Sequence, residues 1–427
     1  MANNTNTDLR NQVIYCIYVR NHTNEGTFKA IEDDLKRIKE LGTDIIWFMP
    51  IHPIGEKNKK GNLGCPYAIK DYRAVNPEYG SLEDFEGLVE KIHSLGMKCI
   101  IDVVYNHTSP DSWLAENHPE FFYRKADGKM GNRVGDWTDI VDLDYSCKEL
   151  WNYQIETLKQ WAKIVDGFRC DVASLVPVEF WQRARKECSS IKEKLIWLAE
   201  SVHLVFLQDF RFRGFDAWSD GELYSAFDIT YDYDIWDIYE KYLKGEMKLS
   251  EYLGYLNFQD AIYPNNYVKL RFLENHDQLR FKNYVSDMSA LESFTAFLYF
   301  QKGTTLIYAG QEFANTHTPS LFDLDKIDRS GTVDLSGLMK KLYETKQNEI
   351  FSNGSYYLTA NNSYDTVIGY YRKGEKTCVG IFPLKGKEGK VEVNIPDGVY
   401  HNELNNEAIV VKGNYVITNG KPIIIMN

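Results

Sequence analysis

Three acidic residues each follow an apolar run that has the composition of a buried strand. Asp171 ends the segment VDGFRCD, Glu200 ends LIWLAE, and Asp277 ends VKLRFLENHD. If these strands are parallel and close into a barrel, their carboxyl ends meet at one face, and so do the three side chains. Carboxylates placed together in this way, with an arginine and histidines beside them, are the groups that glycosidic bond cleavage requires.

One further polar motif follows an apolar run in the same manner, and Asp277 itself belongs to a polar motif. Residues 102–107 read DVVYNH and residues 274–277 read ENHD. With GFRCD at residues 167–171 and with Glu200, they make four polar clusters at the ends of apolar runs. A single acidic residue after a strand is more often the N-cap of a following helix than a catalyst. Four such clusters are better explained by one shared site.

The elements that must position these residues alternate between strand-like and helix-like segments. Apolar runs predict the strands and helical spacing predicts the helices, with Ser81 as an N-cap and Gly42 and Gly96 as C-terminal stops. The strands are expected at residues 13–19, 44–51, 97–105, 166–170, 194–199, 225–230, 268–273 and 304–310. The helices are expected at residues 28–42, 82–96, 147–164, 178–188, 234–243, 290–301 and 337–350.

Eight units of this kind predict an α/β fold, a (β/α)8 TIM barrel. A doubly wound sheet, the alternative for alternating strands and helices, does not need so many units. A long loop follows the third strand, and short alternating runs near the end of the chain predict an antiparallel β-domain. We therefore expect barrel parts at residues 1–106 and 147–350, an inserted domain at 107–146, and a C-terminal β-sandwich-like domain at 351–427.

Composition and charge limit the partners of the chain. Its 427 residues are 44% hydrophobic and 26% charged, and the net charge of -12 disfavours nucleic acid and anionic membranes as partners. No apolar run approaches the roughly 18 residues that span a bilayer. The first residues lack the apolar core of a signal peptide, and the seven cysteines are scattered without a CxxC pair. We expect a cytoplasmic protein, with a secreted form trimmed of its signal peptide as the alternative.

Several motifs together resemble the α-amylase family of glycoside hydrolases, family 13. In chain order they are DVVYNH at 102–107, IVDLD at 140–144, GFRCD at 167–171, Glu200, FLENHD at 272–277 and GQEF at 310–313. Each motif is short, but their order and spacing over about residues 13–350 are together specific. The resemblance implies a retaining hydrolase of α-glucosidic bonds, α-1,4 and in some branches α-1,6. The implied substrates are α-glucans such as starch, or maltooligosaccharides.

The resemblance gives the three carboxylates different roles. Asp171 matches the nucleophile that forms a covalent glycosyl intermediate, Glu200 matches the general acid and base, and Asp277 matches the carboxylate that orients the sugar. Arg169 lies two residues before Asp171, so both side chains point the same way on a strand, and its charge is expected to keep Asp171 ionised. Glu200 has no basic neighbour in sequence, so an apolar setting is expected to raise its pKa.

The substrate contacts implied by the resemblance come from other strand ends and loops. His107 and His276 match histidines that bind hydroxyl groups of the cleaved sugar, and Tyr67 matches the ring that stacks beneath it. Arg169 belongs to the same group, and Asp102 is expected to pair with it. A lone histidine is more often a cap or a buried hydrogen-bond partner, so these roles depend on the motifs.

Calcium is the only cofactor that the resemblance implies. Asn106 and Asp142 match two ligands of the calcium ion that joins the inserted segment to the barrel in the family, and oxygen ligands suit this ion. Many α-amylases carry Lys-His at the third and fourth positions after the nucleophile, where this chain has Ser174 and Leu175. The backbone carbonyl of Leu175 is still available as a ligand, but the side chains that bind sugar beyond the cut are lost.

The motifs leave the linkage and the acceptor open. Members specific for α-1,4 bonds often have alanine after the nucleophile, whereas Val172 resembles the neopullulanase-like branch, and IVDLD is nearer to secreted α-amylases. The same carboxylates also serve transglycosylases and isomerases of α-glucosides. An inactive sugar-binding protein on the same fold is the remaining alternative, but such relatives usually lose a carboxylate, and this chain keeps all three.

Overall fold

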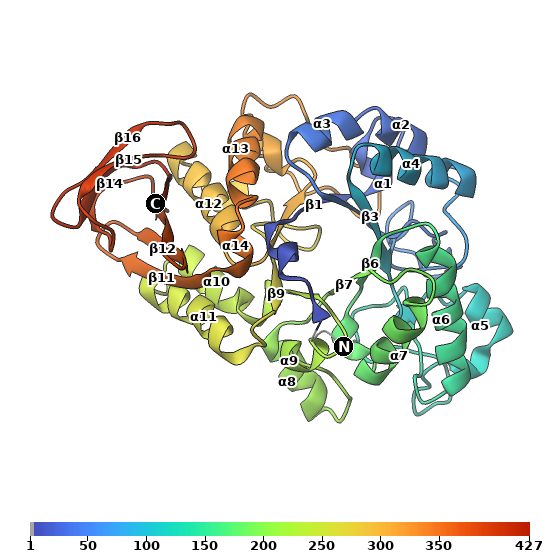
Figure 1. Ribbon diagram of the computed structural model, residues 1–427. Coiled ribbons are helices and arrows are strands. Elements are labelled where there is room, and N and C mark those ends of the chain that lie inside the picture. Colours follow the sequence, from blue (N-terminus) through green and yellow to red (C-terminus); the bar gives the residue numbers. More distant parts are fainter. Residues whose placement is uncertain (1–3) are drawn as a thin grey trace.

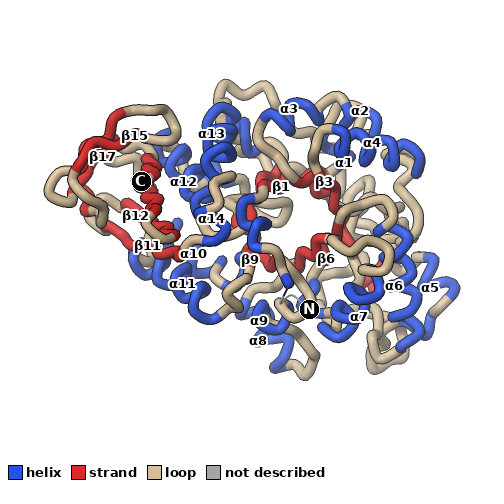
Figure 2. The backbone as a smooth tube through the Cα atoms, viewed as in Figure 1, coloured by secondary structure: helices blue, strands red, loops and turns tan. Residues whose placement is uncertain are grey.

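Eight parallel strands close into a barrel in the computed structural model, which describes residues 4–427 (Figure 1). Viewed along its axis, the barrel is a ring of strands with helices outside it (Figure 2). The strands are β1 (Val13–Ile17), β2 (Ile45–Phe48), β3 (Lys98–Val103), β6 (Gly167–Cys170), β7 (Ile196–Ala199), β8 (Ile229–Tyr231), β9 (Val268–Arg271) and β10 (Thr304–Tyr308). Their order around the barrel is β1-β10-β9-β8-β7-β6-β3-β2, which confirms the predicted fold class.

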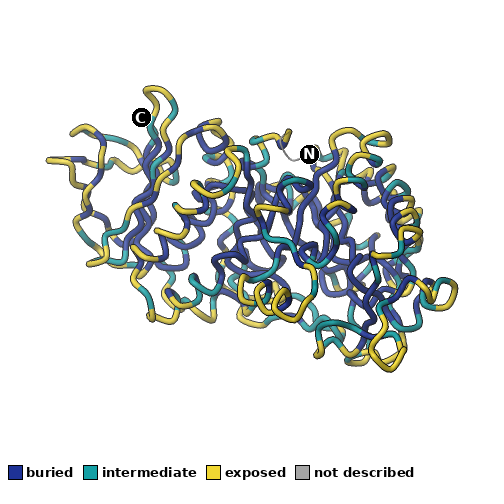
Figure 3. The backbone as a smooth tube through the Cα atoms, turned by 90° about the horizontal axis from the view of Figure 1, so that it is seen from below, coloured by how far each residue is buried: buried dark blue, intermediate teal, exposed yellow. Residues whose placement is uncertain are grey.

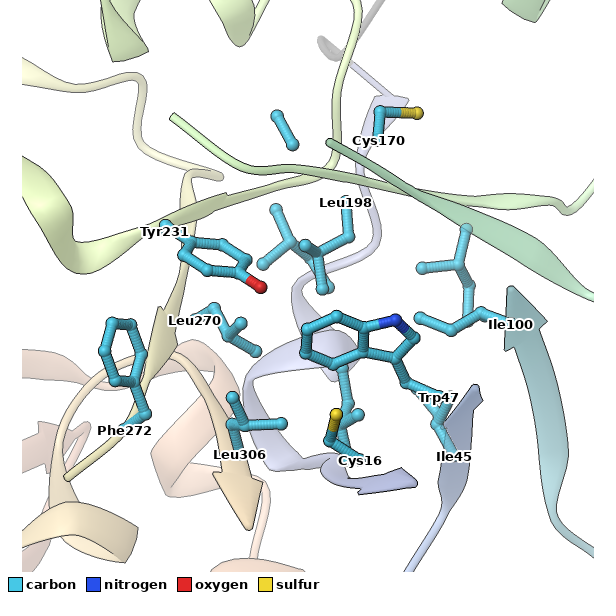
Figure 4. Packing of buried hydrophobic residues seen from close by; sticks show 14 of the residues in the cluster. Cys16, Ile45, Trp47, Ile100, Cys170, Leu198, Tyr231, Leu270, Phe272 and Leu306 are labelled. Atoms are coloured by element: carbon cyan, nitrogen blue, oxygen red, sulfur yellow. The ribbon is translucent and has the colours of Figure 1, made fainter. Parts of the chain in front are cut away.

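The barrel interior is filled by side chains and is not a channel. Cys16, Trp47, Leu198, Tyr231 and Leu306 converge there from different strands (Figure 4). The rings of Trp47 and Tyr231 meet edge to face with centroids 6.4 Å apart. Because helices cover the outer face as well, every residue of β1 and of β2 is buried. Strands buried on both faces have continuous apolar sequences. The apolar runs of the sequence therefore predicted these strands.

Helices after the strands cover the outside of the barrel (Figure 1). The longer ones are α4 (Leu82–Ser94), α6 (Lys148–Ala162), α7 (Val178–Cys188), α8 (Leu204–Phe212), α10 (Trp236–Leu243), α11 (Leu249–Ile262), α12 (Met288–Phe300) and α13 (Ser336–Lys346). The shorter ones are α1 (Val19–His22), α2 (Phe28–Glu32), α3 (Leu35–Glu40), α5 (Trp113–Asn117), α9 (Asp220–Leu223) and α14 (Ile350–Asn353). Ser81 caps α4 as expected, because its side chain accepts from the Asp84 N–H and Asp84 bonds back to the Ser81 N–H.

Several helical segments differ from the sequence prediction, and α8 was not predicted. The single helix expected at residues 28–42 is two helices, α2 and α3, and the segment ends at Gly42 with φ 96°, where a Cβ would lie 2.4 Å from Tyr343. Helix α11 was not predicted. Its outer face carries Tyr255 and Phe258, exposed to 44% and 58%, so its sequence lacks the polar side that marks an amphipathic helix.

The insertion between β3 and α6 begins with a short strand pair. Strand β4 (His107–Thr108) pairs antiparallel with β5 (Val141–Asp142), and His107 lies opposite Asp142. The Tyr72 hydroxyl donates to the His107 carbonyl at 2.6 Å, which ties this pair to the loop after β2. The insertion therefore brings one of its ends directly onto the carboxyl end of the barrel.

An antiparallel β-structure follows the barrel, as predicted, and lies beside α11 and α12 (Figure 1). Its main sheet has the order β11-β12-β13-β18, formed by β11 (Ser355–Asn361), β12 (Thr366–Lys373), β13 (Lys376–Pro383) and β18 (Ile423–Met426). Two further pairs are β14 (Glu388–Glu392) with β17 (Tyr415–Asn419) and β15 (Gly398–His401) with β16 (Ala408–Val411). The Phe300 ring of α12 packs 5.2 Å from Tyr371 and 5.1 Å from Phe382, and buried backbone occupies both the barrel and the sheet (Figure 3).

Two further observations concern the cysteines and the hydrophobicity of the helices. All seven cysteines are free, and five of them are buried: Cys16, Cys99, Cys170, Cys188 and Cys378. Within residues 4–427, no helix is long and apolar enough to cross a membrane.

Candidate active site

The three predicted carboxylates emerge from neighbouring parts of the same barrel face. Asp171 directly follows β6, Glu200 directly follows β7, and Asp277 lies in the loop after β9. The backbone ladder continues one residue past each of the first two strands, since Asp171 N–H donates to Val103 and Glu200 N–H donates to Cys170, both at 2.9 Å. Parallel pairing thus fixes the positions of Asp171 and Glu200 relative to each other.

Arg169 lies at the centre of the group and is fully buried. Its Nη1 donates to Asp102 Oδ1 at 2.9 Å and to Asp171 Oδ1 at 2.8 Å. Its Nη2 lies 2.9 Å from Glu200 Oε1, although this ion pair lacks the alignment of a hydrogen bond. Its Nε donates to the Tyr231 hydroxyl at 3.2 Å. The expected pairing of Asp102 with Arg169 is therefore present, and the pair lies in register across β3 and β6.

The contact between Arg169 and Glu200 differs from the sequence expectation. Glu200 has no basic neighbour in sequence, yet the guanidinium of Arg169 reaches it from the adjacent strand β6. Each strand end contributes side chains to a common centre, so spatial neighbours come from strand register and not from sequence distance. One cation thus faces three buried carboxylates.

Burial of these carboxylates raises the pKa of each above its ordinary value. The pKa of Glu200 rises to about 8, and those of Asp171 and Asp102 rise to about 7, with burial as the largest cause and Arg169 opposing it in each case. Arg169 was expected to keep Asp171 ionised, but burial outweighs its attraction. Three buried carboxyls share one cation, so the group as a whole retains a proton near neutral pH.

Val172 links Asp171, which precedes it, to Glu200 through the backbone. It has φ 33° and ψ 46°, in the left-handed region, where a β-branched residue is strained by roughly 1–3 kcal/mol. Its N–H donates to Glu200 Oε2 at 2.7 Å. The strained turn directly after Asp171 therefore holds the carboxyl group of Glu200 in place.

Tyr67, His276 and His107 lie close to these carboxylates. The Tyr67 hydroxyl donates to Asp102 Oδ2 at 3.1 Å and lies 2.7 Å from His276 Nε2, and the two rings stack with centroids 5.4 Å apart. His107 Nε2 lies 4.0 Å from Asp171 Oδ2. Burial lowers the pKa of both histidines to about 4, so both are neutral near pH 7 and can donate or accept hydrogen bonds with a neutral sugar.

Asp277 is the most accessible of the three carboxylates. Its side chain is 43% exposed, and its Oδ2 lies 3.3 Å from His276 Nε2. The Asn275 side chain accepts from the Asp277 N–H at 2.9 Å. An ion pair between Glu274 and Arg280 at 2.6 Å holds the loop that follows β9.

Two aromatic residues of the site, Trp137 and Tyr233, were not identified from the sequence. The Trp137 ring packs 5.5 Å from His107, and the Tyr233 hydroxyl accepts from Asn275 at 2.8 Å. Trp137 lies within the long insertion, whose path cannot be derived from strand and helix patterns. The only sequence signal for Trp137 was its place in a loop that is rich in aromatic residues and begins at the strand-end histidine His107.

The residues expected to bind calcium are partly engaged with other side chains. Asp142 Oδ2 already accepts from the Arg133 N–H at 2.7 Å and from Arg133 Nη1 at 3.3 Å. The Asn106 side chain lies 3.1 Å from His107 Nδ1. Calcium takes six to eight oxygen ligands, whereas residues 4–427 contain no group of three or more acidic, histidine or cysteine side chains arranged to hold a metal. Arg133 therefore engages one oxygen of the carboxylate that was expected to bind the ion, while Asp142 Oδ1 is buried without a hydrogen-bond partner.

Comparison with protein families gives two matches. The model described as the alpha amylase catalytic domain matches residues 4–130 and 134–372. The model described as the bacterial alpha amylase C-terminal domain matches residues 357–425.

Solved structures and curated proteins agree with these matches. The structure resembles a crystal structure of an alpha-amylase from Lactobacillus plantarum, with TM-score 0.96 and 45% identity over 99% of this chain and 100% of that chain. It also resembles the noncanonic maltogenic alpha-amylase AmyB from Thermotoga neapolitana, with TM-score 0.87 and 33% identity over 98% of this chain and 99% of that one. The curated Alpha-amylase MalA of Haloarcula japonica is 28% identical over 326 residues, which are 70% of this chain and 44% of that protein. The chain thus spans less than half the length of this relative. Because the catalytic-domain match covers most of its residues, the chain belongs to the alpha-amylase family.

Proposed function

We propose that the chain is a retaining glycoside hydrolase that cleaves α-glucosidic bonds in α-glucans or maltooligosaccharides. The observation that carries this proposal is the set of buried carboxylates around Arg169, in which Glu200 has a pKa of about 8 and Asp171 one of about 7. A retaining glycosidase needs one protonated acid and one ionised nucleophile at the same pH. Family membership supports the α-glucan substrate class.

In the first step, Glu200 and Asp171 act on opposite ends of the breaking bond. Glu200 gives its proton to the glycosidic oxygen while Asp171 Oδ attacks the anomeric carbon, so the leaving alcohol departs and a glycosyl ester forms on Asp171. Arg169 stabilises the charge that moves between the two carboxylates. In the second step, Glu200 removes a proton from water, the water oxygen bonds to the anomeric carbon, and Asp171 is released as carboxylate.

The other side chains of the site bind and orient the sugar. The rings of Tyr67 and His276 stack and form one wall of the site. His107, at the start of β4, lies close to Asp171. Asp277 faces the accessible side and orients hydroxyl groups of the reacting sugar. The neutral histidines suit this role, because a neutral imidazole is both a hydrogen-bond donor and an acceptor.

The proposal for the insertion and for the location of the protein follows from the same contacts. Residues 107–146 form an inserted domain that Arg133 and Asp142 hold without calcium, between barrel parts at 1–106 and 147–350. The remaining residues, 351–427, form the C-terminal domain. Free thiols in every cysteine support a reducing compartment, the cytoplasm.

Replacing Asp171 with Asn tests the chemistry. Hydrolysis of maltotriose is expected to fall by about four orders of magnitude or more, because an amide cannot form the glycosyl ester. NMR of the first product of the unmodified enzyme should show the α-anomer. Unchanged turnover in Asp171→Asn, or a β-anomer as the first product, contradicts the proposal.

Acceptor choice decides between hydrolysis and transglycosylation. The glycosyl ester on Asp171 reacts with water or with a sugar hydroxyl by the same route, so both outcomes use the same residues. Product analysis on maltotetraose separates them, since products longer than the substrate indicate transfer. A panel of pullulan, isomaltose and maltotriose gives the linkage.

A further inference from the structure

Tyr231 is a buried residue of the barrel whose contact with Arg169 plays no part in the two chemical steps. It is the last residue of β8, its side chain is fully buried, and its hydroxyl points into the barrel interior (Figure 4). That hydroxyl accepts a hydrogen bond from Arg169 Nε at 3.2 Å. Thr230 lies opposite Ala199 in the pairing of β7 with β8. Tyr231 and Glu200 therefore follow at the same level of two neighbouring strands.

The three nitrogens of the Arg169 guanidinium face different partners. Nη1 donates to Asp171 Oδ1 at 2.8 Å and to Asp102 Oδ1 at 2.9 Å, and Nε donates to Tyr231. Nη2 lies 2.9 Å from Glu200 Oε1 but makes no hydrogen bond. Because the guanidinium is planar and rigid, fixing Nη1 and Nε also fixes the direction of Nη2. The cation is thus hydrogen-bonded to Asp171 and only close to Glu200.

This division suits the roles of the two carboxyl groups. A hydrogen bond from a cation stabilises a carboxylate relative to the carboxylic acid and lowers its pKa. Asp171 attacks as a carboxylate, so its hydrogen bond with Nη1 favours the reactive form. Glu200 must hold a proton for the leaving oxygen, so an aligned hydrogen bond from Nη2 would disfavour the reactive form.

The ring of Tyr231 is held by the aromatic side chains around it. It lies 6.4 Å from the Trp47 ring, 5.2 Å from the Tyr233 ring and 5.6 Å from the Phe272 ring, measured between centroids. These neighbours come from β2 and from the loops after β8 and β9. They leave the hydroxyl group as the polar end of an otherwise apolar contact surface.

The backbone at Tyr231 is held by a buried ion-pair network that touches none of the three carboxylates. Lys269 Nζ, also fully buried, donates to the Tyr231 carbonyl at 2.9 Å. The same ammonium lies 2.9 Å from Asp220 Oδ1 and 2.8 Å from Asp234 Oδ1. The Ser201 hydroxyl donates to the Tyr231 carbonyl as well, at 3.3 Å. With ring and backbone both fixed, the hydroxyl stays where Arg169 Nε finds its acceptor.

Building on the proposed function, we infer that Tyr231 is a positioning residue, whose hydroxyl holds the Arg169 guanidinium in hydrogen bonds with Asp171 and out of alignment with Glu200. Without this hydroxyl the buried Nε–H has no acceptor, and leaving a buried donor without a partner is unfavourable. The guanidinium then turns, and Glu200 Oε1, already 2.9 Å from Nη2, accepts a hydrogen bond from it. The carboxylate of Glu200 is stabilised and the acid loses its proton at a lower pH.

Other titratable groups also face the guanidinium and Glu200, and a substitution at Tyr231 leaves them unchanged. They are Cys16 in β1, Tyr67 after β2, Asp102 in β3, Cys170 and Asp171 at the end of β6, Tyr233 after β8, and His276 and Asp277 after β9. Because these groups are the same in the unmodified enzyme and in the variant, a difference in pH dependence reports on the guanidinium.

The Tyr231→Phe variant removes the hydroxyl and keeps the ring. The value of kcat/KM is measured against pH for maltotriose and for α-maltosyl fluoride, whose fluoride leaves without taking a proton. For maltotriose, the fall at alkaline pH is expected to begin about one pH unit lower than in the unmodified enzyme, a tenfold weaker hold on the Glu200 proton. For maltosyl fluoride, the profile is expected to keep its position, because formation of the ester then needs no acid.

The two donors separate positioning from a general structural role. If Tyr231 only supports the fold, Tyr231→Phe lowers kcat/KM by the same factor for both donors at every pH, and this result overturns the inference. An alkaline fall at the same pH as in the unmodified enzyme overturns it too, while the proposed function stands. If the unmodified enzyme cleaves neither donor, the proposed function is wrong and the inference fails with it.

Tyr224→Phe is the matched control. Tyr224 is buried beside β8, and its hydroxyl donates to the Val268 carbonyl at 3.1 Å and accepts from Thr230 at 2.9 Å. The control removes a buried hydroxyl next to the same strand without touching Arg169, so both pH profiles should keep their positions. An equal shift of the alkaline fall in Tyr224→Phe would show that the effect does not come from Arg169, and would contradict the inference.

Discussion

Arg169 is the residue that allows three carboxylate side chains to be buried together. A single guanidinium contacts Asp102, Asp171 and Glu200 while being fully buried. Three buried negative charges around one positive charge cannot all persist, so the group retains a proton near neutral pH. A lysine at this position would offer one point charge in place of a planar fork and could not serve three partners in this geometry.

The raised pKa values predict the pH dependence of activity. The value of kcat/KM for maltotriose is expected to fall below about pH 7, as Asp171 takes up a proton, and above about pH 8, as Glu200 loses its own. A glycosyl fluoride needs no proton on its leaving group, so the fall at alkaline pH should disappear when maltosyl fluoride is the donor. Rates for both donors across this pH range are the measurement, and identical alkaline limbs would show that Glu200 is not the acid.

Single residues at strand ends were predictable from the apolar runs that precede them. Asp171 and Glu200 follow apolar runs directly, and the structure places both at the same barrel face. The contact of Arg169 with Glu200 crosses from one strand to the next, so no sequence spacing reveals it. Trp137 reaches His107 from the insertion, and its position depends on a loop path that propensities do not determine.

Among the elements, the insertion shows how an arginine contacts a carboxylate that was expected to bind an ion. Arg133 binds Asp142 in β5 and lies 4.3 Å from the Tyr123 ring. It also donates to the Leu143 carbonyl at 3.3 Å. These contacts join the middle of the insertion to its C-terminal part, at the carboxylate where the resemblance implied calcium. The sequence motif IVDLD was identified correctly, but its electrostatic partner came from a position that no motif includes.

Substitution of Arg133 tests this arrangement. Arg133→Gln leaves the Asp142 carboxylate buried without its cation, so the free energy of unfolding is expected to fall by about 2 kcal/mol, as measured by urea denaturation. Arg124→Gln, an exposed arginine of the same insertion that binds only carbonyl groups, is the control and should have little effect. Addition of a chelator should not change the melting temperature of the unmodified protein. Stabilisation by added calcium would contradict the assignment.

Helix α11 illustrates where element prediction failed. Asn257 of this helix donates to the Leu358 carbonyl at 2.8 Å and accepts from the Leu358 N–H at 3.0 Å. These two bonds satisfy the edge of strand β11, as a neighbouring strand would. The helix is therefore held by a tertiary contact while its outer face stays apolar. Its sequence thus lacks the alternation of apolar and polar residues at helical spacing from which a helix is predicted.

At the scale of the whole molecule, the barrel and the C-terminal sheet share a core. Phe300, Tyr371 and Phe382 belong to the same buried cluster as the barrel strands, and the Tyr371 hydroxyl donates to the Phe300 carbonyl at 3.1 Å. The count of eight units predicted the barrel, and the alternating runs predicted the sheet. Which face of the sheet meets the barrel depends on packing, which sequence patterns do not specify.

The shared core predicts one cooperative unfolding transition. Calorimetry of the full chain is expected to show a single peak, and Phe300→Ala should lower the free energy of unfolding by about 3 kcal/mol. Phe212→Ala is the matched control, since Phe212 is 90% exposed and its truncation should change stability little. Two separate peaks would show that the sheet and the barrel unfold independently.

The left-handed backbone of Val172 has a consequence for how this enzyme can change through mutation. The position adjoins Asp171, bonds to Glu200 and lines a hollow beside Glu200 and Asp277. Asparagine and glycine adopt such a conformation more readily than valine. In a saturation library, selection for heat resistance should therefore enrich these two residues. The valine side chain beside the carboxylates thus comes at a cost in stability.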